Sequence, residues 1–119
     1  MDTKAKITAE KIPFSVAEHY LTQSLAGDSA ALKKQCDSNI AQCWRLNSGQ
    51  AYMLTRAENQ ELVVCCFEGQ NLGEIITHVI EAAKNSGFTS IRFHTKRPAI
   101  TRLLKQKFEL AESVFRRKL

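Results

Sequence analysis

The spacing of apolar and polar positions changes several times along the chain, and each change predicts a new element. Between residues 13 and 25 the apolar residues recur at helical spacing, and Gly27 ends this predicted helix. A second, shorter helix is predicted after Asp28, and the polar residues 37–39 predict a turn. We therefore expect the N-terminal part of the chain to contain two helices.

The middle of the chain carries the turn signals and short apolar segments of strands. Residues 40–46 and 50–56 are separated by the turn residues 47–49, which predicts a hairpin. Residues 62–67 follow as an unbroken apolar run, typical of a strand that is covered on both faces. The sequence therefore predicts a three-stranded meander whose third strand is central in the sheet.

The clearest helical pattern comes next. Its apolar residues lie on one helical face, and Gly87 ends the helix. These residues are Leu72, Ile75, Ile76, Val79, Ile80 and Ala83. A strand is predicted over residues 90–95, with Ile91 and Phe93 on one face.

The chain is predicted to close with a helix to about residue 107 and a strand over residues 110–117. This order indicates a mixed α/β (α+β) fold, in which N-terminal helices precede an antiparallel meander and then strand, helix, strand, helix and strand. We expect the connection through the long helix to be a parallel crossover with antiparallel strands on either side of it.

Length and composition favour one domain. The chain has 119 residues, of which 44% are hydrophobic and 24% charged, values typical of a single globular unit. Residues 1–12 are charged and lack a period, so we expect a flexible end before a domain over residues 13–119. Within it, residues 13–37 form the N-terminal helices and residues 40–119 the core. No segment reaches the roughly 18 apolar residues of a membrane span, which favours a cytoplasmic protein.

The four cysteines predict neither a metal site nor a disulfide framework. Cys36, Cys43, Cys65 and Cys66 lack the paired spacing of zinc ligands and the regular spacing of a secreted scaffold. Adjacent residues of a strand point to opposite faces, so Cys65 and Cys66 are interpreted as small buried residues. Their thiols are expected to be inert, because apolar surroundings raise a thiol's pKa.

The formal charge of +5 favours an anionic partner. Basic residues collect in the last quarter of the chain, where Arg97, Arg102 and Lys105 lie on the predicted last helix. These residues are candidates for contact with an acidic protein or with nucleic acid, or they form an ordinary solvated face. The segment has few aromatic residues for stacking on bases, and charge alone does not separate these alternatives.

The loop before the long helix is the best candidate for chemistry. Glu68 ends the central strand, Gly69 follows, and the helix begins a few residues later. The first N–H groups of a helix lack internal partners, and with the helix dipole they favour a phosphate or pyrophosphate. The alternative is that Gly69 only closes the strand and Asn71 only caps the helix.

The loop contains Gln70 and Gly73, and residues 96–108 contain Ala99 and Phe108. These two short motifs resemble those of the GNAT superfamily, the acyl-CoA N-acyltransferases, and the likeness in element order spans residues 40–119. The family's loop motif, Gln or Arg-x-x-Gly-x-Gly or Ala, is matched by Gln70 and Gly73, with Ile75 at the last position. A second family signature aligns with residues 96–108, where Ala99 and Phe108 match. The family's tyrosine, which protonates the departing thiolate, is replaced by Leu103.

This resemblance implies an acyl-CoA-dependent transfer, with acetyl-CoA as cofactor and an amine as acceptor. The cofactor-binding residues that it implies are Phe67, Gln70, Asn71, Leu72, Gly73 and Glu74. Glu68 is the candidate base, acting directly or through water. Ile75 is expected to add bulk, and Glu74 negative charge, near the pyrophosphate.

The alternative is a non-enzymatic GNAT-like binding module. Short members of this kind, some of them phage-encoded, are similar in length and also lack parts of the family motifs. Such a module would contact a protein or nucleic acid through the basic residues of the last helix. Homodimerisation through a sheet edge is compatible with either reading.

Overall fold

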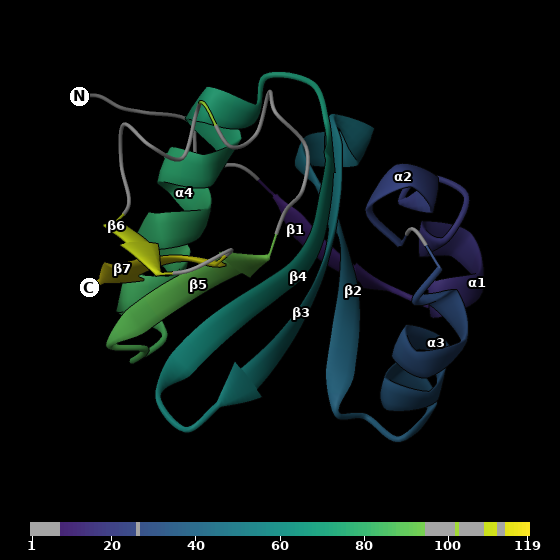
Figure 1. Cartoon of the computed structure of the whole chain (residues 1–119). Coiled ribbons are helices and arrows are strands. Elements are labelled where there is room, and N and C mark those ends of the chain that lie inside the picture. Colours follow the sequence, from purple (N-terminus) through teal and green to yellow (C-terminus); the bar gives the residue numbers. More distant parts are fainter. Residues whose placement is uncertain (1–7, 26, 95–101, 103–108, 112–113) are drawn as a thin grey trace.

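A computed structural model describes residues 8–25, 27–94, 102, 109–111 and 114–119. Within this part of the chain, seven strands form one sheet in the order β1-β2-β3-β4-β5-β7-β6 (Figure 1). Of the described strand pairs only β4 and β5 run parallel, as predicted for the crossover. The predicted mixed α/β fold is thereby confirmed, with β4 at the centre of the sheet.

The N-terminal segment differs from the expectation in two ways. Residues 9–12, expected to be flexible, form strand β1 (Ala9–Ile12), which pairs antiparallel with β2. The single helix predicted over residues 13–25 is two short helices, α1 (Phe14–Ala17) and α2 (Thr22–Leu25). Strand β1 could not be recognised from its pattern because only Ile12 of its four residues is buried. The break between α1 and α2 could not be recognised because the apolar residues on both sides of it still face the core.

The helix and meander that follow agree with the sequence pattern. Helix α3 (Ser29–Asp37) leads into β2 (Ala41–Leu46), a short 3-10 turn at Asn47–Gly49, β3 (Ala51–Glu58) and β4 (Glu61–Gly69). Val63 and Val64 are both fully buried, which confirms that the apolar run is covered on both faces.

A bulge in β4 changes where its two cysteines lie. Leu54 pairs with Cys66 and Thr55 with Val64, so Cys65 is an extra residue in the ladder. Both cysteines therefore pack against the cluster beneath the N-terminal helices. The prediction of opposite faces was wrong because it assumed an unbroken two-residue period.

The second half of the chain contains helix α4 (Leu72–Asn85) and strand β5 (Ser90–His94), as predicted, and Ile91 and Phe93 are buried. The predicted last strand is instead an antiparallel pair, β6 (Glu109–Ala111) and β7 (Val114–Lys118). The predicted last helix lies outside the described residues, except for Arg102.

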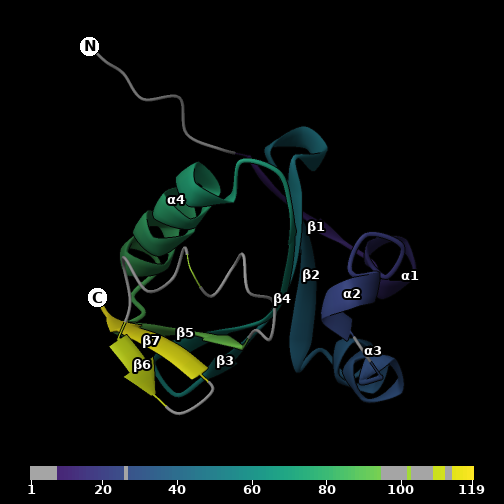
Figure 2. The same cartoon turned by 45° about the horizontal axis from the view of Figure 1, so that its top comes forward.

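Helices cover both faces of the sheet. Helix α4 lies on one face and α1, α2 and α3 on the other (Figures 1 and 2). Each face has its own buried cluster, one around Met53, Phe67 and Ile76 under α4 and one around Leu21, Leu54 and Cys66 under the N-terminal helices. In the described part of the chain, no helix combines the length and apolar character needed to cross a membrane.

Candidate functional site

Strands β4 and β5 are paired only over the first part of β4. The register joins residues 61–64 to residues 90–93, after which β4 continues to Gly69 without β5 beside it. Figure 1 shows β5 beside the first part of β4, and β4 continuing past the end of β5 toward the loop that precedes α4. The rings of Phe67 and Phe93 meet edge to face at this point, with centroids 5.6 Å apart.

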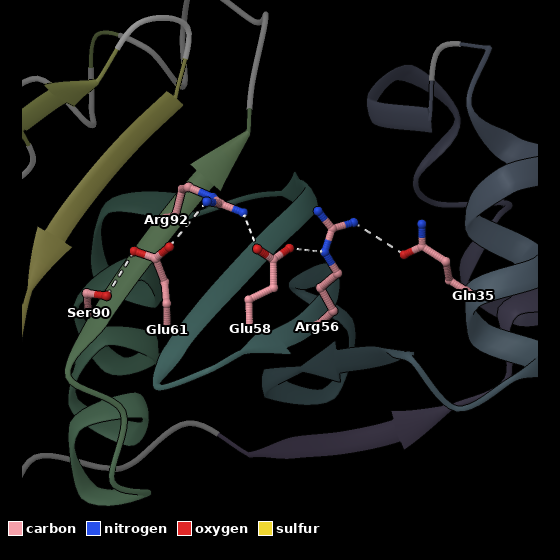
Figure 3. A network of polar contacts seen from close by, with 6 residues as sticks. All are labelled: Gln35, Arg56, Glu58, Glu61, Ser90 and Arg92. Atoms are coloured by element: carbon pink, nitrogen blue, oxygen red, sulfur yellow. Dashed lines mark hydrogen bonds and ion pairs between the residues drawn. The ribbon is translucent and has the colours of Figure 1, made fainter.

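A polar network fastens the paired end (Figure 3). The Arg92 guanidinium lies 2.9 Å from Glu58 and 3.3 Å from Glu61, joining β5 to β3 and β4. Arg56 binds the other oxygen of Glu58 at 2.6 Å, and Ser90 donates to Glu61 at 2.8 Å. The β4–β5 junction is thus held by charged side chains where the strands pair. Strand β4 continues past this pairing as residues 65–69, the open end of β4.

Glu68, the candidate base, lies at the open end and is buried, with 8% of its surface exposed. The Ser24 hydroxyl of α2 contacts both the Glu68 carboxylate and, at 3.3 Å, the Phe67 carbonyl oxygen. Helix α2 therefore holds this carboxylate in place on the face of the sheet that carries the N-terminal helices.

An open hollow of about 390 Å³ adjoins Glu68, between the loop before α2, the β2–β3 turn and the end of β4. Tyr20 and Tyr52 form part of its lining and stack with ring centroids 4.0 Å apart. Tyr52 is the cross-strand neighbour of Glu68. Burial and a hydrogen bond with Tyr20 raise the pKa of Tyr52. The sequence analysis gave neither tyrosine a role, because only strand register brings them to Glu68.

The loop after β4 is anchored to the start of β3. Gly69 has φ +147°, and a Cβ there would overlap the Gln50 carbonyl oxygen and the Ala51 backbone. The Gln70 N–H donates to the same carbonyl at 2.8 Å. Glycine is therefore required by the close approach of two backbones.

The N-terminus of α4 presents amide donors that the helix itself does not bond, and a carboxylate lies in the same turn. Helix geometry leaves the N–H groups of Leu72, Gly73 and Glu74 without intrahelical acceptors. Asn71 has a left-handed backbone and does not cap these groups; its Nδ2 donates to Glu74 Oε2 at 2.9 Å. Glu74 Oε1 lies 3.9 Å from His78 Nε2.

Ile75 does not obstruct this loop. The sequence analysis expected its branched side chain near the phosphate approach, but Ile75 is 1% exposed and packs into the core beneath α4. The helix turns this position inward, so Ile75 adds no bulk to the amide cradle, by which we mean the N–H groups of residues 72–74. Glu74, in contrast, adds a negative charge beside these groups.

The other candidate groups do not join this site. Burial raises the pKa of Cys66 to about 12, which agrees with the inert role expected for it. Among the described residues, no three His, Cys, Asp or Glu side chains are grouped as metal ligands. Arg102 is exposed, whereas Arg97, Leu103 and Lys105 lie outside the described residues.

The chain resembles known proteins in its structure but not in its sequence. No family model and no curated protein sequence matches the chain. An IAA acetyltransferase from Bacillus cereus matches with a TM-score of 0.67 and 10% identity, over 95% of this chain and 99% of that one. An acetyltransferase from Bacillus subtilis in complex with CoA gives 0.67 and 10%, over 98% and 99%.

The ribosomal-protein-S18-alanine N-acetyltransferase from Escherichia coli matches with a TM-score of 0.67 and 13% identity, over 94% of this chain and 93% of that one. These matches extend over nearly the full length on both sides. At such low identity they establish the architecture. The chain therefore has the fold of the GNAT acetyltransferases.

Proposed function

We propose that the protein is an acyl-CoA-dependent N-acyltransferase that transfers an acetyl group to an amine. The observation that carries this proposal is that β4 continues past its pairing with β5 and leads directly to the first amides of α4. An extended ligand with a phosphate end fits such a site, because its phosphates can meet the amides while its chain follows the strand edge.

The residues at the start of α4 fit a pyrophosphate, although one of them, Glu74, carries a charge that repels it. Three consecutive N–H donors at Leu72, Gly73 and Glu74 suit an anion. Gly69 and Gln70, tied to Gln50, fix the loop that presents them. The Glu74 carboxylate lies in the same turn and weakens the attraction without removing the donors.

When bound, acetyl-CoA would supply an activated acyl thioester, and the acyl group would lie near Cys66 and Phe67. Glu68 would accept the proton of the attacking amine, directly or through water. Backbone N–H groups at the end of β4 would polarise the acyl carbonyl. The hollow beside Tyr20 and Tyr52 gives the amine a route to Glu68 from the face that carries α2.

Two readouts test this function together. Acetyl-CoA should shift the backbone amide resonances of residues 70–74 in an NMR titration. Glu68→Gln should leave those shifts in place and slow transfer to an amine about 10²–10⁴-fold. Glu81→Gln, an exposed position on α4, is the matched control and should transfer at the wild-type rate.

The second candidate, a binding module without transfer activity, is favoured by the Glu74 carboxylate at the amide cradle. It would be indicated by unchanged amides at residues 70–74 and by salt-sensitive binding to a polyanion that weakens in Arg102→Gln. Shifted amides with no turnover for any amine would indicate a cofactor-binding module.

A further inference from the structure

The C-terminus of α3 is built as a tight turn that brings two cysteines together. Asn39 has a left-handed backbone, with φ 60°. Its N–H donates to the Cys36 carbonyl at 3.1 Å, and the Ile40 N–H donates to the Gln35 carbonyl at 2.8 Å. This pair of bonds is a Schellman motif, which ends the helix and reverses the chain into β2. The turn thereby fixes Cys36 above Cys43.

The two sulfur atoms are in contact. Cys36 Sγ lies 3.8 Å from Cys43 Sγ, with Cys36 partly exposed and Cys43 buried. A hollow of about 280 Å³ opens beside them, lined by Lys11, Phe14 and Gln42 among others. One thiol is therefore reachable from solvent, and the other lies directly behind it.

From this arrangement we infer a dithiol modification site at Cys36 and Cys43 that reacts with low-molecular-weight disulfides. The inference is independent of the acyltransferase proposal, because the pair lies on the α3–β2 connection and uses none of the residues at the end of β4. Neither cysteine was expected to pair from its spacing in the sequence, since the geometry depends on the Asn39 turn.

The reaction has two exchange steps. The Cys36 thiolate attacks one sulfur of the small disulfide, forms a mixed disulfide and releases one small thiolate. The Cys43 thiolate then attacks Cys36 Sγ, which forms the Cys36–Cys43 bond and releases the second small thiol. Two protein thiols are oxidised, the small disulfide is reduced to two thiols, and the two thiol protons pass to the released thiolates.

The same geometry assigns the order of the steps. Cys36 reacts first because it is the accessible member of the pair, and Cys43 resolves because its sulfur lies 3.8 Å behind that of Cys36. Bond formation requires the sulfurs to approach to about 2.05 Å, a closure of less than about 2 Å that side-chain rotation can supply. Burial raises the pKa of both thiols, so the reaction is slow at neutral pH and faster in mild base.

Peptide mapping tests the assignment directly. The folded protein is equilibrated with a mixture of reduced and oxidised glutathione at mildly basic pH, alkylated and digested with trypsin. One tryptic peptide, residues 35–45, holds both Cys36 and Cys43, and another, residues 57–84, holds Cys65 and Cys66. We expect the first to lose the mass of two hydrogens and the second to carry two alkyl groups.

Two comparisons make the result specific. Cys36→Ser should abolish the internal disulfide, while Cys65→Ser, a cysteine in the same buried cluster, should leave it unchanged. The equilibrium constant for disulfide formation should be about tenfold or more higher in the folded protein than in urea, because the fold holds the sulfurs together.

Three results would overturn the inference. The first is a peptide 35–45 that remains fully alkylated or that carries a persistent glutathione adduct. The second is a cross-link between the two peptides. The third is an equilibrium constant that is equal or lower in the folded protein, and this comparison decides the matter with the wild-type chain even if a variant does not fold.

Discussion

The two halves of β4 show how one strand serves both the core and the candidate site. Its first half, residues 61–64, lies between β3 and β5 and is fastened by the Arg92 ion pairs. Its second half, residues 65–69, keeps β3 as a partner but leaves β5 behind after the bulge at Cys65. This second half, the open half, leads to Glu68 and to the amides of α4.

The position of the site therefore depends on where the pairing of β4 with β5 ends. The paired half positions β5 and sets where the pairing ends, while the open half carries the groups that are proposed to meet a ligand. Substitutions that disturb strand pairing or the packing of backbones should therefore change folding stability, and substitutions of Glu68 or Glu74 should change binding or transfer. The predictions below separate these two effects.

The largest effect is expected from Phe93→Ala, at the end of the paired segment. Phe93 is 1% exposed and meets Phe67 edge to face, so its removal leaves a cavity and should cost about 3–5 kcal/mol of unfolding free energy. Urea unfolding measures it. Phe93→Leu, which keeps most of the volume, should cost less than about 1.5 kcal/mol. Equal losses in both variants would contradict the packing role.

Gly69→Ala should be the next largest, at about 1–3 kcal/mol, because the new methyl group meets the backbone of Gln50 and Ala51. Gly87→Ala is the matched control, since Gly87 also has a positive φ, +94°, but open space around it. The control measures backbone strain alone. If both variants lose the same stability, close approach to β3 does not explain Gly69.

The polar network gives the paired half an acid-sensitive stability. Hydrogen bonds from Arg56 and Arg92 lower the pKa of Glu58 below its ordinary value of 4.5. The folded state therefore binds fewer protons, so this contribution is present above about pH 4.5 and is lost as pH falls through the folded pKa. Glu58→Gln should flatten the fall of unfolding free energy below pH 4.5, while Glu81→Gln, exposed on α4, should not. If the unfolding free energy of Glu58→Gln falls with pH as steeply as that of the wild type, the polar network does not cause the acid sensitivity.

The smallest effect is expected from Glu74→Gln. Removing this charge from the amide cradle should strengthen binding of coenzyme A by several-fold, on the order of 1 kcal/mol, and the gain should shrink in high salt. Glu81→Gln, farther along the same helix, is again the control. Weaker binding in Glu74→Gln would mean that the carboxylate contributes to the site.

The sequence predicted most of the fold because most elements carry a complete pattern. In the meander, α4 and β5, the apolar residues recur at strand or helix spacing along the whole element. The position of the loop at Gln70 and Gly73 follows from the order of these elements. Three features depend on tertiary contacts and could not be predicted. Strand β1 has only one buried residue, Ile12, and forms by pairing with β2. The β4 bulge is set by pairing with β3, and the position of the Glu68 carboxylate is set by a hydrogen bond with Ser24 of a helix distant in the sequence.

The candidate site was predicted in part. Local sequence indicates amides at a helix start, but it does not tell which way Ile75 points or that Tyr52 is the cross-strand neighbour of Glu68. The helix turn decides the first and strand register the second. The cysteine pair on α3 and β2 depends in the same way on the left-handed turn at Asn39.

The open half of β4 and the start of α4 are proposed to hold coenzyme A. Calorimetric titration of the purified protein with acetyl-CoA and coenzyme A tests this proposal most directly, alongside Gly73→Trp, whose side chain should fill the amide cradle, and Lys84→Trp at an exposed position far along the helix. The account predicts binding to the wild type and to Lys84→Trp, and loss of binding in Gly73→Trp. No binding to the wild type at millimolar ligand, or equal binding to all three proteins, would contradict it.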